Sequence, residues 1–147
     1  MFTILNQKVE IKIVIFYNGD MEVITMGLDL IISEQSDFNI DEFGRHTYKV
    51  TQLFQIRDYY AILNQLEYIS EDCLSIGGSY RFFGQAFHKV LEELQIKLVE
   101  LSNKTFCSEY KEYRRKELEY NIEKLEEFIA TNEVSNDYIQ TYEVSIL

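Results

Sequence analysis

The chain has 147 residues but no proline and no tryptophan, and it has only two cysteines and two histidines. Cys73 and Cys107 are too few and too far apart for the disulfide framework of a small secreted domain. The chain also lacks the CxxC and HExxH spacings that are typical of zinc centres. We therefore expect no metal and no other cofactor, and we interpret both cysteines as buried structural residues.

Long hydrophobic runs are also missing. The longest apolar run, from Ile13 to Tyr17, is much shorter than the ~20 residues that a membrane-spanning helix needs. The first residues show neither the basic stretch nor the apolar stretch of a signal peptide. These features predict a cytoplasmic protein that does not contact a membrane.

Basic residues are scarce, because 14 Lys and Arg stand against 25 Asp and Glu, for a formal net charge of -11. This balance argues against direct binding to nucleic acid, since domains that bind phosphates are normally basic. With 46% hydrophobic and 14% aromatic residues, the chain is too apolar to be a disordered acidic tail. We expect one folded domain spanning residues 1–147, and a basic protein as its partner.

The first clear pattern is a β-hairpin. Residues 8–17 are rich in β-branched and aromatic residues and end at Asn18-Gly19, which favours a type I′ turn. If these two residues form the loop, the predicted pairs are Tyr17 with Asp20, Ile13 with Ile24, Ile11 with Met26, Lys12 with Thr25 and Val9 with Leu28.

The remaining chain predicts one strand, three helices and a final strand. We expect a third strand at His46–Phe54, and then helices over residues 56–70, from the N-cap Ser79 to about 103, and over 108–130. Whether residues 104–107 break or bend the last two helices stays open. Residues 138–147 alternate like a strand. The predicted fold is α+β, in the order β-β-β-α-α-α-β, with one antiparallel sheet made by the hairpin, the third strand and the C-terminal strand and packed against the three helices.

The excess negative charge lies outside the long helices. Residues 81–131 hold 10 acidic and 9 basic residues, whereas residues 1–55 hold 8 and 4. We interpret residues 33–44 as an exposed acidic loop held by its apolar residues, and loops of this kind often carry binding residues. The predicted partner-binding residues are Glu34, Asp37, Phe38, Asp41, Glu42, Phe43, Glu71 and Asp72.

These observations favour a non-catalytic acidic binding protein. The leading hypothesis is a stoichiometric inhibitor of a basic nucleic-acid-handling protein such as a nuclease or a CRISPR effector, as immunity, anti-CRISPR and anti-restriction proteins are. In this hypothesis the loop carboxylates mimic phosphates and aromatic side chains anchor the partner. An alternative is an adaptor or structural protein, including a homodimer, that pairs through its amphipathic helices.

A lesser alternative is a binder of small anions at residues 77–81. Gly78, Ser79 and Arg81 precede a predicted helix, whose N-terminal N–H groups attract anions. The segment matches neither the P-loop nor the dinucleotide-binding pattern. The basic cluster at residues 111–116 is interleaved with acidic residues, so we interpret it as a solvated ionic helix face. No residue pattern in the chain identifies a reaction.

Overall fold

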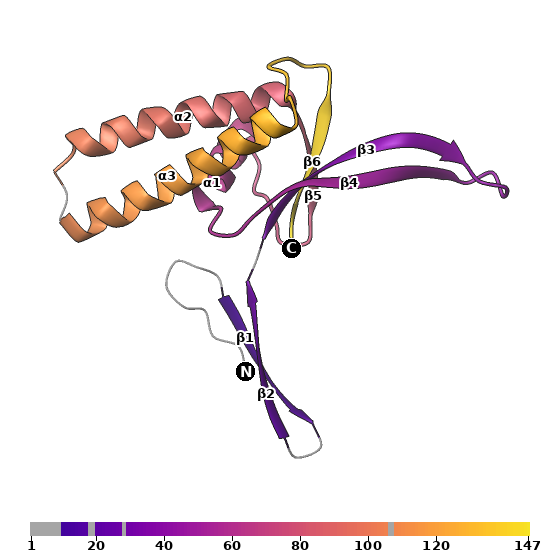
Figure 1. The fold of residues 1–147 in the computed structure, drawn as a ribbon, viewed down its shortest axis with the longest axis horizontal. Helices are drawn as coiled ribbons and strands as arrows, with labels where there is room; N and C mark the ends of the chain where they lie inside the picture. The colour runs from indigo at the N-terminus through magenta and orange to yellow at the C-terminus, as the bar shows by residue number, and fades with distance from the viewer. Residues whose placement is uncertain (1–9, 18–19, 28, 106–107) are drawn as a thin grey trace.

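The computed structural model describes residues 10–17, 20–27, 29–105 and 108–147, with side chains described for residues 29–35, 40–105 and 108–147. The fold is α+β, as predicted, and Figure 1 shows its arrangement. In chain order the elements are β1 (Glu10–Tyr17), β2 (Asp20–Gly27), β3 (Leu30–Ile40), β4 (His46–Ile56), α1 (Tyr60–Ser70), β5 (Ser79–Phe83), α2 (Gly84–Asn103), α3 (Ser108–Thr131) and β6 (Thr141–Ile146).

A four-stranded antiparallel sheet, in the order β4-β3-β6-β5, carries the helices on one of its faces. The C-terminal strand β6 lies inside this sheet, between β3 and β5. Along β6, Tyr142, Val144 and Ile146 are buried, whereas Glu143 and Ser145 between them are not. Because successive side chains of a strand point to opposite faces, the buried set faces the helices. We call the other side the open face of the sheet.

Aromatic rings form the centre of the core between the helices and the sheet. Phe87 of α2 packs edge-on against Phe128 of α3 and Tyr142 of β6, with centroid distances of 5.4 and 5.6 Å. Phe54 of β4 also contacts Phe128, with a centroid distance of 5.2 Å. Such aromatic pairs contribute about 0.5–1.5 kcal/mol each beyond the area that they bury. They hold α2 and α3 against the middle of the sheet.

The predicted register of the N-terminal hairpin is confirmed. Tyr17 pairs with Asp20, Ile13 with Ile24, Ile11 with Met26 and Lys12 with Thr25. The Asn18-Gly19 loop and the Val9–Leu28 pair lie outside the described residues. The sheet differs from the prediction, because β1 and β2 form a separate two-stranded sheet that projects from the rest of the fold (Figure 1). The C-terminal strand therefore pairs with β3 and not with this hairpin.

The interpretation of residues 33–44 as a loop is wrong. Leu30–Ile40 forms one long strand, β3, and only residues 41–45 connect it to β4. Polar and acidic residues weaken the strand pattern locally, but β4 supplies hydrogen-bonding partners along almost the whole of β3. Register shifts after Ile32 and after Ser36 interrupt the regular alternation that identifies a strand in sequence.

The prediction of Ser79 as a helix N-cap is also wrong. Residues 79–83 form β5, and α2 begins only at Gly84, with Phe83 as its N-cap. A β-carbon at residue 84 would collide with the backbone carbonyl oxygen of Ser135, so glycine permits this approach. The Gly84 N–H in turn donates to the carbonyl of Gln140 at 3.1 Å. Long-range packing therefore decides where the strand ends and the helix starts.

The three predicted helices are present, and some of their ends differ from the predicted bounds. Helix α1 begins at Tyr60 because residues up to Ile56 belong to β4, and Asp58 between them adopts a left-handed conformation with φ of 59°. Helices α2 and α3 are separate, because α2 ends at Asn103 and α3 begins at Ser108. They lie side by side as a hairpin of helices (Figure 1).

Candidate interaction surface

The outer parts of β3 and β4 extend away from the helices as a two-stranded ribbon (Figure 1), and we call residues 34–51 the arm. β6 pairs with β3 only from Leu30 to Ser33, so it does not extend along the arm. A two-stranded ribbon without a packed face is at best marginally stable in water. A partner that packs against the arm would therefore stabilise it.

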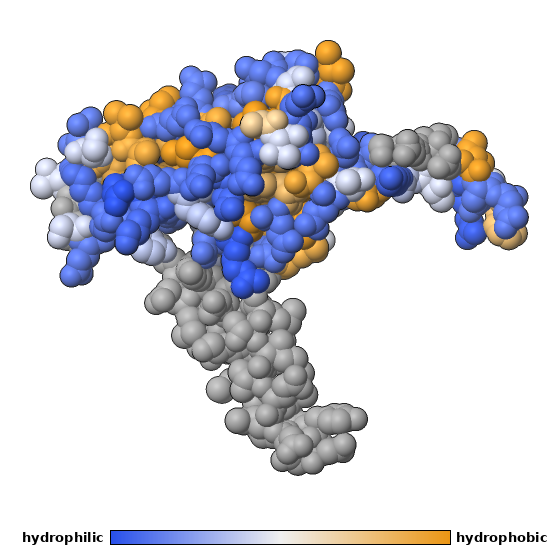
Figure 2. Space-filling model, viewed as in Figure 1, coloured by the Kyte–Doolittle hydropathy of each residue, from blue (hydrophilic) through white to orange (hydrophobic). Residues whose placement is uncertain are grey.

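Large apolar side chains are exposed along the arm. Their exposed fractions are 62% for Ile40, 74% for Phe43, 55% for Tyr48 and 56% for Val50. Figure 2 shows hydrophobic residues near the end of this ribbon. Apolar residues gathered in this way are typical of protein interaction sites, because burying them releases the free energy of removing apolar area from water.

The turn at the tip of the arm uses the carboxylate of Asp41 internally. Asp41 accepts hydrogen bonds from the N–H groups of Phe43 and Arg45, at 2.9 and 2.8 Å, and from Arg45 Nε at 2.8 Å. The Arg45 guanidinium also lies 5.0 Å from the centroid of the Phe43 ring. These contacts shape the turn and present Phe43 to solvent. Of the two predicted acidic residues of this turn, Glu42 is exposed to solvent, whereas the carboxylate of Asp41 is hydrogen-bonded within the turn.

Of the other predicted partner-binding residues, Glu34, Glu71 and Asp72 do not join Phe43 and Glu42 in one patch. Asp37 and Phe38 lie on β3, and their side chains are outside the described residues. Glu34 lies at the base of the arm, where its Oε2 accepts a hydrogen bond of 3.0 Å from Gln140 Nε2. Glu71 and Asp72 follow the C-terminus of α1 in the body of the fold, away from the arm (Figure 1). The predicted acidic surface is thus divided among three places.

One of these places surrounds the hydroxyl of Tyr142. Burial raises the pKa of Tyr142, and the negative charges of Glu34 and Asp137 raise it further. These two carboxylates come from β3 and from the connection between α3 and β6, which are far apart in sequence. The fold therefore brings Glu34 together with Asp137, a residue outside the predicted partner-binding set, beside Tyr142.

The three residues predicted to hold an anion lie in or beside β5 and not at a helix N-terminus. Ser79 is an exposed strand residue, and a β-carbon at Gly78 would collide with the side chain of Tyr80. The Tyr80 hydroxyl accepts a hydrogen bond from the N–H of Ser75 at 2.8 Å, which shapes the turn before β5. Arg81 projects onto the open face, where it donates to Gln35 Oε1 at 3.0 Å.

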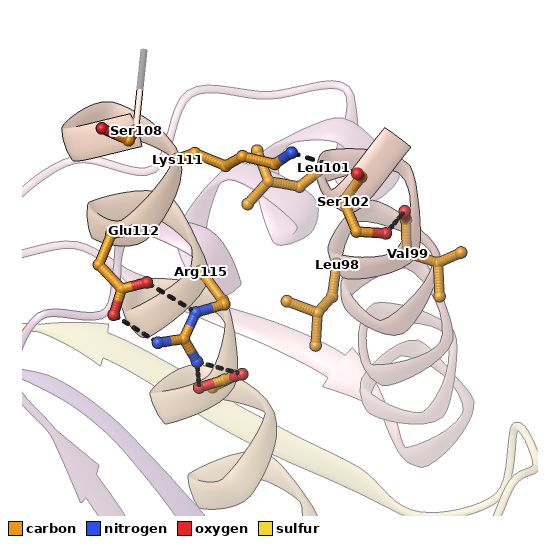
Figure 3. A pocket seen from close by; sticks show the side chains of 9 residues that line it. Leu98, Val99, Leu101, Ser102, Ser108, Lys111, Glu112 and Arg115 are labelled. Carbon is orange, nitrogen blue, oxygen red and sulfur yellow. Dashed lines mark hydrogen bonds and ion pairs between the residues drawn. The ribbon is translucent and has the colours of Figure 1, made fainter. Parts of the chain in front are cut away.

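A second exposed feature is a groove of about 440 Å³ between the C-terminal part of α2 and the N-terminal part of α3 (Figure 3). Its α2 side is lined by the apolar residues Leu98, Val99 and Leu101, and its α3 side by charged residues. Val99 is 63% exposed. The groove therefore joins an apolar wall to an ionic wall.

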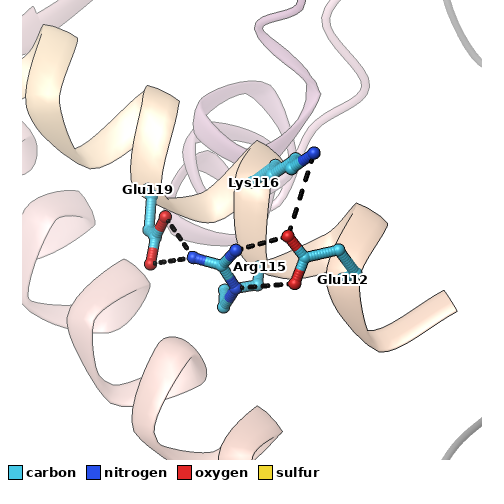
Figure 4. Close-up of polar contacts among 4 residues, drawn as sticks. All are labelled: Glu112, Arg115, Lys116 and Glu119. Atoms are coloured by element: carbon cyan, nitrogen blue, oxygen red, sulfur yellow. Dashed lines mark hydrogen bonds and ion pairs between the residues drawn. The ribbon is translucent and has the colours of Figure 1, made fainter. Parts of the chain in front are cut away.

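The ionic wall agrees with the interpretation of residues 111–116 as a solvated ionic helix face, with acidic residues beside Arg114, Arg115 and Lys116. Figure 4 shows the Arg115 guanidinium between the carboxylates of Glu112 and Glu119, with Arg115 Nη1 2.8 Å from Glu119 Oε2. The hydrogen bond from Arg115 holds the pKa of Glu112 below its usual value. Lys116 Nζ lies 3.8 Å from Glu112 Oε1. These bases are occupied by neighbouring acids and do not form a basic patch.

The described titratable residues with catalytic potential have structural contacts. Cys73 is exposed, so the prediction of a buried structural cysteine is wrong there, and Cys107 lies outside the described residues. A hydrogen bond with Glu67 is the main cause that raises the pKa of the Cys73 thiol, which disfavours the reactive thiolate. His88 Nε2 is 2.6 Å from the carbonyl oxygen of Val134. Among the described residues, no three His, Cys, Asp or Glu side chains converge as metal ligands.

Sequence reasoning missed Tyr48, Val50 and Gln35 as surface residues of interest. Tyr48 and Val50 are two residues apart on the predicted third strand, which places them on one face. That spacing was a usable signal, but the sequence does not show which face the helices cover. Gln35 lay within the supposed loop, so its position on a sheet face was hidden.

Comparison with known protein families, with curated proteins and with solved structures gave no significant match. Within the described ranges, none of the helices combines the length and the apolar character that crossing a bilayer requires.

Proposed function

We propose that this chain is a non-catalytic binding protein that uses the arm to hold a basic protein partner. The observation that carries this proposal is the set of exposed apolar side chains on the arm, where Phe43 at the tip is 74% exposed. The arm projects beyond the helices, so a partner can enclose it on several sides (Figure 1). Aromatic side chains enclosed in this way are the residues that most often dominate binding energy.

The net charge of -11 supports a basic partner. Opposite net charges accelerate the encounter of two proteins, and salt screens this acceleration. The finer proposal is that the partner handles nucleic acid, as a nuclease or a CRISPR effector does, and that the chain inhibits it stoichiometrically. Its support is the combination of a small acidic chain with a projecting apolar arm.

The hydrogen bonds of Asp41 change which residues of the arm we expect to contact the partner. Its carboxylate already accepts three hydrogen bonds from its own turn, so it is not free to replace a phosphate. Glu42 is exposed beside it. We therefore propose that the apolar residues supply the affinity, while Glu42 and the net charge mainly raise the association rate.

The test begins with capture from the native host on the immobilised full chain, at low and at high salt, followed by mass spectrometry. Phe43→Ser is compared with Tyr68→Ser, a matched change of a 78% exposed aromatic residue on α1. The proposal requires a basic protein that Tyr68→Ser retains and Phe43→Ser loses. A partner that both variants retain equally would place the interface elsewhere.

The captured partner, once purified, allows a kinetic test of the charge. Glu42→Lys is compared with Glu126→Lys, which reverses an exposed carboxylate on α3. We expect Glu42→Lys to lower the association rate several-fold at low salt and to have little effect at high salt. Equal effects of the two reversals would mean that only the net charge matters.

The groove between α2 and α3 favours a second candidate function, an adaptor that pairs through its helices. The apolar wall of the groove and the exposed Val99 are the specific observations for it. Such an interface is mainly apolar, so binding would change little with salt. Loss of the partner in Val99→Asp, with full retention in Phe43→Ser, would favour this candidate over the arm.

A further inference from the structure

Arg81 differs from the four other arginines of the chain. Arg45, Arg57, Arg114 and Arg115 each form an ion pair with a carboxylate, at Asp41, Asp29, Glu117 and at Glu112 and Glu119 respectively. Among the described residues, Arg81 forms no ion pair, and its one hydrogen-bonding partner is Gln35. In a chain with 25 acidic residues, an arginine left without a carboxylate has donors available for a ligand.

The guanidinium of Arg81 is held in a defined position by its neighbours on the open face. Gln35 Oε1 accepts from Arg81 Nη2 at 3.0 Å, and Gln35 Nε2 donates to Glu143 Oε2, also at 3.0 Å. The amide of Gln35 thus lies between the positive and the negative side chain. β5 and β6 place Arg81 and Glu143 directly opposite each other in register. The two charges are neighbours, but an amide bridges them in place of a direct ion pair.

These residues line a hollow of about 190 Å³ at the base of the arm. Its other lining residues are Tyr48, Thr141 and Tyr142, so most of its lining side chains are polar. Sites for drug-sized ligands usually measure about 300–1,000 Å³, so this hollow suits a smaller molecule. Its charge is mixed, because its two charged lining residues are Arg81 and Glu143.

We infer that this hollow binds a small dipolar ligand of the α-amino acid class. A carboxylate accepts two parallel hydrogen bonds from an arginine, which is the geometry that the free donors of Arg81 offer. A simple anion would be repelled by Glu143, and a simple cation would be repelled by Arg81. A ligand with both charges places its carboxylate on Arg81 and its ammonium group on Glu143. This inference does not rest on the proposed function of the arm.

The test is a titration of the full chain with each of the twenty standard L-amino acids, followed by backbone amide NMR signals. We expect at least one of them to shift the signals of residues 35, 81 and 143 saturably, at concentrations up to about 10 mM, which detects dissociation constants near 1 mM. The N-acetyl form and the amide form of that amino acid each lack one charge, and each should bind at least tenfold more weakly.

Variants separate this site from general effects on the fold. Arg81→Gln and Glu143→Gln should each abolish saturable binding and leave the midpoint of urea unfolding unchanged. Arg57→Gln, which removes an exposed arginine paired with Asp29, should bind like the natural chain. The inference is overturned if none of the twenty amino acids binds saturably, if the N-acetyl or amide form binds as tightly as the parent, or if Arg81→Gln binds normally. None of these results bears on the Phe43→Ser capture experiment, which tests the proposed function of the arm.

Discussion

At the scale of single residues, Asn121 is the polar residue on which the helix packing depends most. It is fully buried, and the other buried residues of α3 are the hydrophobic Leu118, Leu125 and Phe128. Its Nδ2 donates to the carbonyls of Asp58 and Glu117, at 3.0 and 2.9 Å, and its Oδ1 accepts from the N–H of Ile62 at 3.4 Å. One side chain thus satisfies the backbone where β4 turns into α1.

We predict that Asn121→Leu destabilises the chain by about 2–6 kcal/mol, because the Ile62 N–H and the Asp58 carbonyl lose their partner, and each such loss costs about 1–3 kcal/mol. The measurement is the free energy of unfolding in urea. Asn64→Leu makes the same change at an exposed position of α1 and should alter stability by less than about 0.5 kcal/mol. Similar values for both variants would show that the hydrogen bonds of Asn121 contribute little.

Tyr59 makes stability depend on alkaline pH. Burial, with smaller contributions from the charges of Tyr60 and Asp29, raises the pKa of Tyr59 to about 12. The unfolded chain releases this proton near pH 10, which is the ordinary pKa of tyrosine. Between these values the unfolded state binds fewer protons than the folded state, so stability falls as pH rises. The contribution is complete below pH ~10 and is lost progressively toward pH ~12.

We therefore predict that Tyr59→Phe reduces the loss of stability on going from pH ~9 to pH ~11.5 by about 2 kcal/mol. Urea unfolding at the two pH values gives the difference. Tyr68→Phe serves as the control, because it removes the same hydroxyl group from a tyrosine that is 78% exposed. Parallel pH profiles for the two variants would contradict the assignment to Tyr59.

At the scale of elements, β3 and β4 each consist of two unlike halves. Their inner halves belong to the four-stranded sheet, where Leu30, Ile32 and Ile56 are buried against the helices. Their outer halves form the arm and pair only as a ribbon. The local free energy of opening depends on buried apolar contacts, so the two halves should open independently.

Hydrogen exchange should reveal this boundary along a single strand. We predict that amides of residues 46–51 exchange at least tenfold faster than those of residues 53–56 in the same strand, β4, in the isolated chain. Exchange measured by NMR resolves the individual amides. Equal protection in dilute solution would mean that something already covers the arm, and dilution would then distinguish self-association from intrinsic stability.

At the scale of the whole molecule, the last strand completes the sheet. β6 pairs with both β3 and β5 and contributes the buried residues Tyr142, Val144 and Ile146. The backbone of Leu147 then exchanges two hydrogen bonds with Asp29, at 2.8 and 3.0 Å. β6 and Leu147 therefore pair with residues 29–33, which lie more than a hundred residues earlier in the chain.

Truncation tests this dependence. Deleting residues 141–147 should abolish cooperative unfolding, because it leaves β3 and β5 without their common neighbour and exposes the aromatic core. Deleting Leu147 alone, which is 59% exposed, should lower stability by only about 1–2 kcal/mol. Near-ultraviolet circular dichroism and urea unfolding measure both effects. A cooperative transition in the longer deletion would show that β6 is dispensable.

The single-domain prediction for residues 1–147 stays a prediction.

Local sequence patterns were enough to predict the features that depend on neighbouring residues. The Asn18-Gly19 dipeptide and the flanking alternation set the register of β1 and β2, and Tyr17 does pair with Asp20. The three-to-four-residue period of apolar side chains identified α1, α2 and α3, because a helix forms its hydrogen bonds within one segment. The exposure of Glu42 was also predictable, whereas Phe43, which was expected to hold the loop in place, is 74% exposed.

Other features depend on segments that are distant in the chain, and they could not be predicted from local patterns. β3 and β5 are strands because β4 and β6 pair with them, and Ser79 lies in a strand although its sequence resembles a helix cap. Gln35 meets Arg81 and Glu143 only because the strands that carry these residues lie in one sheet. The physical reason is that a strand bonds to other segments, so its partners, and the face that stays open, are set by contacts that no local pattern contains.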